Sequence, residues 1–504
     1  MELVDECLRS IEHHDPVLHA FNLVLPDAAR AAARAAQAEL RAGHDRGPLH
    51  GIPFGVKDVY DVAGLPTTGY SRAFLDRRAT GHATAVARLV DAGAVFVGKL
   101  ATHELANGGP SFDLPWPPAR NPWDLERVTG GSSTGAGAAV ASGLLPAALG
   151  TDTGGSVRIP ASLCGVTGLK PTSGRVSRAG VLAHSHSIDH CGPLAWTVED
   201  CAILLQAIAG ADLRDPTASG EPVPDYRAGF TPHLRGLRIG IVRRYWETDL
   251  PADAETAGAL EQAIGVLRSL GAGVETVDLP PLQQYYDVKT VIAKREVFDT
   301  YRPFLVERLD RFGADFLGMT LGGCLYGEDD LRHAHAARRR LAAAMDDALQ
   351  RCDVLMTASS GPAGRFEDVG PARVIDHWSR PNRETPFSVT GCPALALCIG
   401  FTRGGLPLGM QLAGRRFDEA TVLRTGHACE RAAGWRSRRP VLGDAPAPLR
   451  APAPAAYPEP EALSLARADE TLRAFDLQPG DAHLRQLCAV WTHALEAARR
   501  VRMI

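Results

Sequence analysis

Short apolar segments alternate with longer alanine-rich segments along most of the chain. The apolar segments have the length of strands, as in PFGVKDV (53–59), AVFVGK (94–99), LRIGIV (237–242) and CDVLMTA (352–358). Apolar positions recur at helical spacing in 26–43 and 83–93, and short Gly and Pro connections separate the two kinds of segment. This alternation predicts an α/β fold, a single large domain with a mixed central β-sheet covered by helices.

The middle of the chain contains two segments of different character. Residues 208–235 predict a loop-rich connector, and residues 254–350 are helical and charged. We expect the helical segment to hold substrate-specific insertions around the cleft of the main domain.

The C-terminal end changes character again. Residues 445–461 are an Ala/Pro-rich run that predicts a stiff, extended linker. Two helical patterns follow within 462–504, separated by the turn signal LQPGD (477–481). The sequence therefore predicts a large main domain at 1–444, a linker at 445–461, and a small C-terminal helical hairpin at 462–504.

The second helix of that hairpin carries an apolar stripe. Its members recur at helical spacing: Leu484, Leu487, Val490, Trp491 and Leu495. A lone hairpin cannot bury such a stripe, so we expect it to dock on the main domain or on another chain, the second case giving a homo-oligomer.

Composition excludes several classes of function. The chain has 504 residues with 45% hydrophobic content and a formal net charge of −4, so it can bury a large core. It has no basic stripe with interleaved aromatic residues, which argues against direct nucleic-acid binding. No apolar run reaches the roughly 20 residues that span a bilayer.

The N-terminus and the cysteines indicate a cytoplasmic protein. The opening MELVDECLRSIEHH is too charged for a secretory signal. The ten cysteines include no Cys-x-x-Cys pair, so we interpret them as reduced thiols of the core. The histidines form no HExxH motif, and we expect neither a metal nor another cofactor.

Two glycine loops that carry serines are the strongest chemical signal. GGSSTG (130–135) and GTDTGGS (150–156) offer hydroxyl groups at Ser132, Ser133 and Ser156, with almost no side chain to shield the backbone. Such loops let several N–H groups converge on one oxygen, as an oxyanion hole requires. Residues 135–146 predict a buried Gly/Ala helix whose N-terminus lies at the first loop, where its dipole favours negative charge.

Lysine is scarce in this chain, and one lysine stands in an apolar run. Only five of the 54 Lys and Arg residues are lysines, which suggests that lysine is kept where arginine cannot replace it. Lys57 lies in GIPFGVKDV (51–59), which predicts a short buried strand. A buried ammonium is costly, so Lys57 either pairs, for example with Asp58, or becomes a neutral amine that accepts protons.

Taken together, the motifs resemble the amidase signature family of serine hydrolases. The resemblance covers roughly residues 1 to 440 and rests on ordered motifs: GIPFGVKD (51–58), VGKL (97–100), NPW (121–123), GGSST (130–134), GTDTGGSVR (150–158), CGVTGLKPTSGRVS (164–177), SIDHCGP (187–193), TPFSVTGCPA (385–394) and GLPLGMQLAG (405–414). Other serine chemistries do not fit, because the chain has no GxSxG elbow at Ser156.

The resemblance implies a role for each residue of the loops. Ser156 matches the nucleophile, Ser132 the bridging serine that follows a cis peptide bond, and Lys57 the base. The oxyanion hole is then expected from the N–H groups of four residues: Thr153, Gly154, Gly155 and Ser156. Three further residues are expected to support these groups: Ser133 by bonding the lysine or the serine loop, and Asp152 and Arg158 by pairing across the nucleophile loop. For the last two, a purely structural role stays open.

Three residues depart from the family pattern without removing a catalytic atom. Thr134 replaces a common glycine, Ser388 stands where Asn is frequent, and Ala358 stands where Pro is usual. The aromatic loop 111–123 precedes the serines, and its Phe112, Trp116 and Trp123 either line the substrate pocket or form a rigid structural segment, which we favour.

Two functions fit the resemblance. The first is a free-standing amidohydrolase acting on a small-molecule amide and releasing ammonia or an amine. The second is the glutaminase (A) subunit of a tRNA-dependent amidotransferase. We favour the first, because the C-terminal hairpin faintly resembles the small helical subunit that accompanies some amidases of this family. The triad does not define the acyl group.

Overall fold

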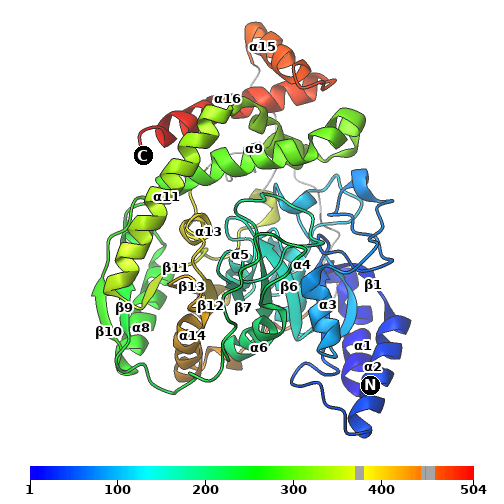
Figure 1. Cartoon of the computed structure of the whole chain (residues 1–504), viewed down its shortest axis with the longest axis vertical. Helices are drawn as coiled ribbons and strands as arrows, with labels where there is room; N and C mark the ends of the chain where they lie inside the picture. Colours follow the sequence, from blue (N-terminus) through cyan, green and yellow to red (C-terminus); the bar gives the residue numbers. More distant parts are fainter. Residues whose placement is uncertain (369–379, 444–448, 450–459) are drawn as a thin grey trace.

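The computed structural model describes residues 1–368, 380–443, 449 and 460–504. Nearly all of the predicted linker at 445–461 lies outside the described residues. A single mixed sheet runs through the main body of the molecule (Figure 1).

Eleven strands form this sheet, in the order β1-β3-β2-β6-β8-β7-β12-β13-β11-β9-β10. Their bounds are β1 (Phe21–Val24), β2 (Pro53–Lys57), β3 (Val95–Leu100), β6 (Ala147–Asp152), β7 (Thr167–Lys170), β8 (His190–Ala195), β9 (Arg238–Ile241), β10 (Gly273–Thr276), β11 (Val354–Ala358), β12 (Ala394–Phe401) and β13 (Pro407–Gly414). A separate two-stranded sheet pairs β4 (Arg120–Asn121) with β5 (Asp124–Val128). The four apolar segments singled out in the sequence form β2, β3, β9 and β11, so the predicted α/β fold with a mixed sheet is confirmed.

Helices cover both faces of the sheet. Their bounds are α1 (Glu2–Leu18), α2 (Pro26–Arg41), α3 (Thr84–Asp91), α4 (Thr134–Ala141), α5 (Arg158–Leu163), α6 (Val198–Ile208), α7 (Arg244–Glu247), α8 (Ala254–Ser269), α9 (Leu282–Arg308), α10 (Ala314–Thr320), α11 (Glu328–Arg351), α13 (Thr385–Val389), α14 (Glu419–Ala433), α15 (Ala462–Arg473) and α16 (Asp481–Val501). Short 3₁₀ turns complete the set: η1 (Arg72–Phe74), η2 (Glu104–Ala106), η3 (Leu309–Arg311), η4 (Leu321–Leu325), η5 (Phe366–Asp368) and η6 (Trp435–Ser437).

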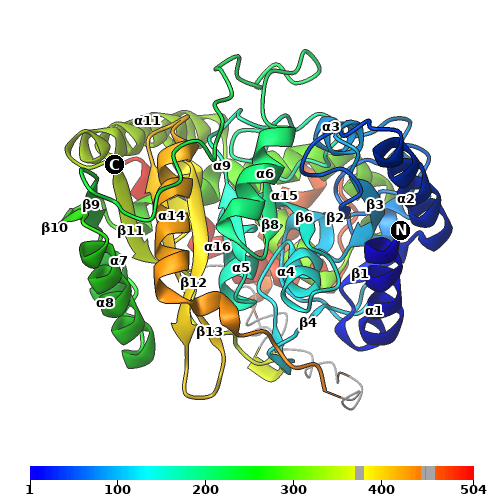
Figure 2. The same ribbon diagram turned by 90° about the horizontal axis from the view of Figure 1, so that it is seen from below.

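Alternate residues of the strands point into different hydrophobic clusters. In β6, Ala147 and Leu149 belong to a cluster that also contains side chains of α3, α6, α8 and α14, whereas Ala148 belongs to one with side chains of α1, α2, α4 and α5. Figure 2 shows α6 and α14 side by side along one face of the sheet. Towards the β11 and β13 end, the second face is covered instead by α9 and α11.

Local sequence explains where the helices near the serine loops begin and end. Pro26 occupies the first turn of α2, where its missing N–H is not needed. The Gly/Ala helix α4 ends at Ala141, earlier than the predicted 135–146, because Gly143 adopts φ +76° and cannot continue the helix. All eight residues of α4 are buried, as the small side chains predict.

Strand pairing brings the two functional loops to one edge of the sheet. β2 and β6 are parallel neighbours, with Val56 opposite Leu149. Lys57 at the end of β2 therefore lies beside the start of the GTDTGGS loop. The loop that precedes α4 reaches the same edge through a hydrogen bond from Ser133 N–H to Ser156 O, at 3.2 Å.

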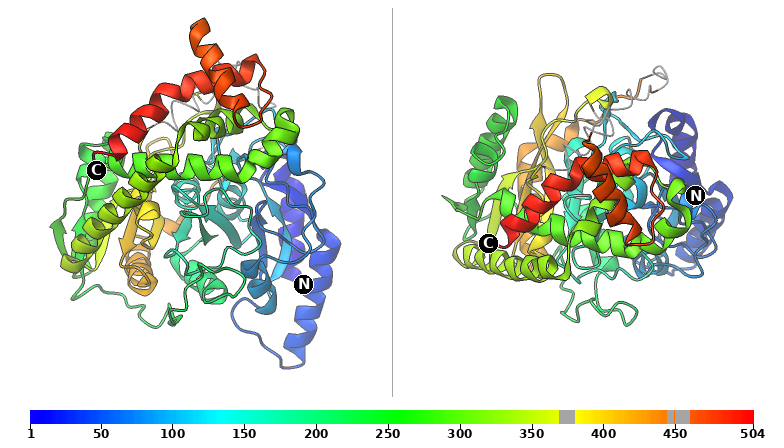
Figure 3. Two further views of the ribbon diagram at one scale, coloured as in Figure 1. Left: turned by 45° about the horizontal axis from the view of Figure 1, so that its top comes forward. Right: turned by 90° about the horizontal axis from the view of Figure 1, so that it is seen from above.

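The C-terminal hairpin docks on the main domain. α16 packs along α9, α10, α11 and η4, and Figure 3 shows α15 and α16 lying across α9. Leu487 and Val490 are buried in this contact. The prediction for Leu495 was wrong: it is 49% exposed, because the buried stripe continues through Ala494 and Ala497, whose small side chains let the helices approach closely.

Two further expectations concern the cysteines and membrane-spanning helices. Nine of the ten cysteines are buried, and all ten are unpaired. Within the described part of the chain, no helix combines the length and the apolar character needed to cross a bilayer.

Candidate active site

Lys57 and Ser132 lie in hydrogen-bond contact at the edge of the sheet. Lys57 Nζ donates to Ser132 Oγ at 2.7 Å and to Thr151 Oγ1 at 2.8 Å. Lys57 is fully buried, and Ser132 is 1% exposed. The peptide bond between Gly131 and Ser132 is cis. The two signals that the sequence offered 75 residues apart therefore meet in one buried contact.

The structure decides between the two alternatives for Lys57. Asp58, the neighbour in sequence, forms its ion pair with Lys99 instead, at 2.7 Å. Lys57 is bonded only to hydroxyl oxygens within the described residues. Burial lowers the pKa of Lys57 to about 7, and the more distant carboxylates of Asp189 and Asp152 offset only part of that effect. Near neutral pH a large share of Lys57 is therefore an uncharged amine.

The loop between β6 and α5 presents Ser156 at the surface of the site. Ser156 is partly exposed, unlike Ser132 and Ser133. Gly155 before it has φ +122°, and a Cβ there would meet Ile159 and Glu384 side chains at 2.7 and 2.8 Å. Only glycine fits this conformation and this space. Among the described residues, no hydrogen bond involves Ser156 Oγ, so the hydroxyl is free to turn.

The carboxylate of Asp152 holds the conformation of this loop through hydrogen bonds to its main chain. It accepts hydrogen bonds from Gly155 N–H at 2.8 Å and from Val157 N–H at 3.2 Å. The Gly155 N–H is therefore already bonded within the protein. In the described structure, the N–H groups of Thr153, Gly154 and Ser156 have no such partner and remain available to an external oxygen.

Asp152 and Arg158 form a buried ion pair, as the sequence led us to expect. The two guanidinium contacts measure 3.0 Å each, and both side chains are fully buried. Burial alone would raise the pKa of Asp152, but the charge and hydrogen bonds of Arg158 hold that pKa well below its usual range. Ser388 joins the pair, accepting from Arg158 at 2.7 Å and donating to Asp152 at 3.1 Å. The Ser388 hydroxyl thus hydrogen-bonds both members of the ion pair, at the position where the family often has Asn.

Ser133 bonds neither the lysine nor the side chain of Ser156. Its hydroxyl donates to Thr151 O and accepts from Thr151 N–H, both at 3.3 Å. Its contact with the nucleophile loop is the main-chain bond to Ser156. Ser133 therefore joins the two loops through their backbones.

Sequence reasoning missed two residues of the site. Thr151 fixes Lys57, and Asp189 accepts a hydrogen bond from Thr153 Oγ1 and two more from the N–H groups of His184 and Ser185. Both lie inside motifs that carry the resemblance, GTDTGGS and SIDHCGP. The signal was therefore present, but nothing in the local sequence indicates that Thr151 faces Lys57.

A cavity of about 430 Å³ opens beside the GGSSTG loop and α5, and Ser156 is not among the described residues that line it. Gly130, Gly131 and Ile159 line it on the loop side, and Lys289 lines it from α9. The other walls come mainly from 360–364 and 380–384. The cavity thus joins the GGSSTG loop to the long helical segment where we expected substrate-specific insertions.

The aromatic loop 111–123 serves packing. Trp123 donates to Cys164 O at 2.8 Å and packs on Phe401, and Trp116 packs on Tyr70. Neither these residues nor Phe112 is among the described residues that line the cavity. The structural interpretation of this loop is therefore the better one.

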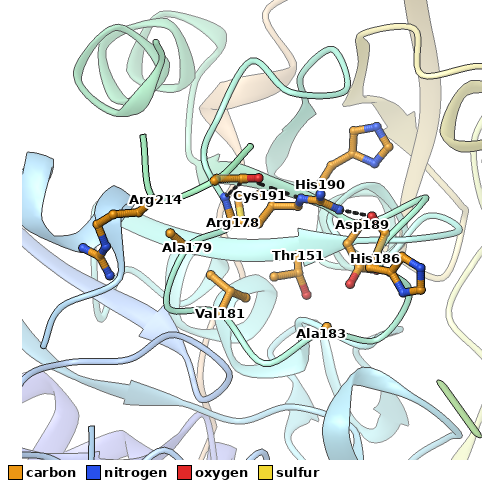
Figure 4. A pocket seen from close by; sticks show the side chains of 11 residues that line it. Thr151, Arg178, Ala179, Val181, Ala183, His186, Asp189, His190, Cys191 and Arg214 are labelled. Carbon is orange, nitrogen blue, oxygen red and sulfur yellow. Dashed lines mark hydrogen bonds and ion pairs between the residues drawn. The ribbon is translucent and has the colours of Figure 1, made fainter. Parts of the chain in front are cut away.

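A smaller cavity of about 220 Å³ is lined by Thr151 (Figure 4). Arg178, His186 and Asp189 surround it, together with Cys191. Arg178 is held there by an ion pair to Asp215 at 3.7 Å. Thr151 thus contacts Lys57 and also lines this cavity.

The scarcity of lysine proved informative. Lys57, Lys99 and Lys170 are fully buried and Lys294 is 9% exposed, while Lys289 lines the larger cavity. Each lysine thus occupies a site inside the fold, and none is an ordinary surface cation.

Comparison with known proteins gives consistent matches over most of the chain. A family model described as "Amidase" matches residues 2–423. A glutamyl-tRNA(Gln) amidotransferase subunit of Chloroflexus aggregans is 41% identical over 471 residues, which span 88% of this chain and 95% of that protein. A putative amidase AmiD of Mycobacterium tuberculosis is 39% identical over 451 residues, 88% of this chain and 92% of the relative.

A solved structure agrees with these relatives. The native peptide amidase from Stenotrophomonas maltophilia is 32% identical, with a TM-score of 0.72 over 88% of this chain and 95% of that one. The residues that the family model matches include both serine loops and the strand that carries Lys57. The chain therefore belongs to the amidase signature family of hydrolases, which act on C–N amide bonds.

Proposed function

We propose that this protein is a free-standing amidohydrolase in which Ser156 attacks a carboxamide, Ser132 relays the proton and Lys57 is the base. The contact between Lys57 and Ser132 carries the proposal, since a buried amine without a carboxylate partner is suited to accept a proton. The reaction needs no cofactor, and we expect it to take place in the cytoplasm.

The proton transfers follow from the hydrogen bonds around Lys57. As a neutral amine, Lys57 can donate one hydrogen to Thr151 Oγ1 and accept the Ser132 hydroxyl hydrogen across the same 2.7 Å. Ser132 in turn takes the proton of Ser156 as Ser156 Oγ bonds to the amide carbon. The tetrahedral intermediate collapses when the C–N bond breaks, and the relay returns a proton to the leaving nitrogen. A water molecule then hydrolyses the acyl-enzyme by the same route.

The carbonyl oxygen gains negative charge in this step. Three of the four predicted donors, the N–H groups of Thr153, Gly154 and Ser156, remain available to hold it, whereas Gly155 N–H supports the loop through Asp152. One well-placed donor of this kind lowers a barrier by about 3 to 4 kcal/mol. The Arg158 pair with Asp152 keeps these donors in place without touching the substrate.

A labelling experiment and a substrate panel test the proposal together. A fluorophosphonate probe should label the parent protein but not Ser156→Ala, and ammonia release from a panel of primary amides should be lost in the same variant. Ser142→Ala removes a hydroxyl that bonds only the carbonyls of α4 and should change neither result. Labelling that survives Ser156→Ala would reject Ser156 as the nucleophile.

A second function is supported by the 41% identity to a glutamyl-tRNA(Gln) amidotransferase subunit. A glutaminase of this kind would hydrolyse glutamine for a tRNA-binding partner. The docked α15–α16 hairpin favours the free-standing enzyme, because a small helical element is already fused to this chain. Copurification with a larger tRNA-binding chain, together with glutamine hydrolysis that depends on it, would favour the second function.

A further inference from the structure

Lys289 projects from α9 into the larger cavity, directly over the nucleophile loop. A Cβ on Gly154 would lie 3.1 Å from Lys289 Cε and 3.5 Å from Nζ. The glycine at this position thus leaves the room that the lysine side chain occupies. Lys289 and Lys57 both act on the same histidine. Burial, followed by the positive charges of Lys289 and Lys57, lowers the pKa of His184 to about 3.

The ammonium of Lys289 has no partner in the described structure. Lys57, Lys99 and Lys170 each bond an oxygen of the protein. Neither a hydrogen bond nor an ion pair involves the ammonium of Lys289 or of Lys294 among the described residues, but only Lys289 lines the cavity. Burial lowers the pKa of Lys289 to about 8, so most of it still carries a positive charge at neutral pH. Lys289 is partly exposed, and a bound anion would offset the cost of placing the rest of this charge in the cavity without a counter-ion.

Most of the other charged atoms of this cavity are engaged, apart from Glu384 Oε2 and the guanidinium of Arg380. Glu384 accepts hydrogen bonds from the hydroxyls of Ser359 and Ser360, at 2.9 and 3.0 Å. Arg383 donates to three main-chain carbonyls, and Asp368 has an interaction of its own. Arg380 lines the cavity from an exposed position and adds a second positive charge.

We propose that Lys289 binds a carboxylate of the substrate, so that the enzyme acts on short amides that carry an acidic group, such as the monoamides of dicarboxylic acids. This inference rests on the proposed function, because it places the scissile carbonyl at the Thr153–Ser156 loop. Lys289 lies over Gly154 of that loop, so the carboxylate and the amide are joined by a short chain. A charge-assisted hydrogen bond would fix the acyl group with its carbonyl towards the loop N–H groups.

Binding to an inactive protein tests the inference separately from the chemistry. Calorimetric titration of Ser156→Ala with succinamate and with succinamide compares two ligands of the same shape, of which only the first carries a charge. Malonamate and malonamide repeat the comparison with a shorter chain. We expect one of the acidic amides to bind about tenfold or more tightly than its diamide. That preference should disappear in Ser156→Ala/Lys289→Met and in Ser156→Ala/Lys289→Gln, the second of which keeps a polar side chain of similar length.

Lys294 provides the matched control on the same helix. Ser156→Ala/Lys294→Met removes an equal charge five residues further along α9, at a residue that does not line the cavity, and should keep the preference. Equal binding of acid and diamide in Ser156→Ala, including no measurable binding of either, would overturn the proposal. A preference that survives both Lys289 substitutions would also overturn it. Failure of the proposed function would appear elsewhere, as labelling or ammonia release that persists in Ser156→Ala.

Discussion

Lys57 Nζ lies 2.7 Å from Ser132 Oγ, and the only other hydrogen-bond partner of Lys57 in the described structure is the Thr151 hydroxyl. This relationship sets the chemistry of the site, because a lysine paired with a carboxylate would stay protonated and could not act as a base. Asp58, the nearest acid in sequence, is occupied by Lys99. The fold thus buries the proposed base and pairs its sequence neighbour Asp58 with another lysine.

Lys57→Arg should be almost as inactive as Lys57→Ala, although it keeps the positive charge. A guanidinium is not deprotonated in a protein, so it cannot take the proton of Ser132. We expect kcat/KM for ammonia release to fall by about 10²- to 10⁴-fold in both variants, the range that a general base commonly supplies. Substantial activity in the Arg variant would mean that Lys57 has a structural role only.

The parent enzyme should lose activity on the acid side of neutrality. The active form needs neutral Lys57, and its pKa is lowered to about 7, so the fraction of neutral amine falls about tenfold for each pH unit below that value. A profile of kcat/KM between pH 5 and pH 9 measures this limb. A flat profile down to pH 5 would show that no group with such a pKa controls the reaction.

The same pKa shift predicts that Lys57 destabilises the folded protein. Its pKa falls from 10.5 in the unfolded chain to about 7 in the folded one. The folded state therefore disfavours the protonated form, and the stability cost is absent above pH 10.5, grows as the pH falls, and is complete below about pH 7. Lys57→Met should accordingly be inactive yet melt at the same or a higher temperature at pH 7. The difference should shrink towards pH 10, and a marked loss of stability at pH 7 would contradict the argument.

Loss of the Asp152–Arg158 pair should lower both the stability of the fold and the reaction rate. Arg158→Met leaves a buried carboxylate without its counter-ion, and breaking such a pair typically costs about 3 to 5 kcal/mol. Ser388→Ala removes only the bridging hydroxyl and should cost about 1 to 2 kcal/mol. Urea unfolding of the three proteins gives this order.

The contribution of the Asp152–Arg158 pair to folding stability should depend on pH. The pKa of Asp152 is depressed, so its contribution is complete above the unfolded pKa of 3.8 and is lost only at lower pH. In Arg158→Met, burial without the counter-ion raises the pKa of Asp152, so the destabilisation should be largest at pH 8 and shrink towards pH 5 as the carboxylate takes up a proton. An Arg158→Met protein with unchanged stability and full activity would show that the pair is dispensable.

The sequence predicted the α/β fold, and it pointed to Lys57 and Ser132, which the structure brings into contact, because both signals are local. β2 and β3 are apolar runs of strand length, and the serine loops are marked by glycines that the backbone requires, as at Gly155 with φ +122°. Contacts between distant segments were harder to predict. Nothing near Thr151 indicates that it faces Lys57, and nothing near Lys289 indicates that α9 crosses over Gly154.

The error at Leu495 has a similar cause. A helical wheel identifies an apolar stripe, but the partner helix decides which edge of that stripe is buried. Here Ala494 and Ala497 face the main domain, since their small side chains allow close packing, and Leu495 is turned outwards. The direction of docking is tertiary information that the hairpin sequence alone does not contain.

The α15–α16 hairpin should be dispensable for the reaction, but it should be needed to cover apolar surface of the main domain and so to prevent association. Leu487 and Val490 pack against Phe298, Phe316 and other apolar side chains of the main domain, so a chain that ends at Asp444 exposes that surface. Exposed apolar patches of several hundred Å² promote association. The truncated chain should keep fluorophosphonate labelling at Ser156 and its rate per labelled molecule, but elute as a larger species in size-exclusion chromatography.

Point variants on α16 refine this test. Leu487→Asp places a charge in the buried contact and should reproduce the change in size, whereas Leu495→Asp, on the exposed side of the same helix, should elute like the parent. Arg500→Met removes the ion pair to Asp287, whose two contacts measure 2.7 and 2.8 Å, and should also weaken docking because it leaves the buried Asp287 carboxylate without its counter-ion. A truncated chain that stays soluble, keeps the size distribution of the parent and is inactive would show that the hairpin contributes to the active site, and the domain boundary at 444 would then be wrong.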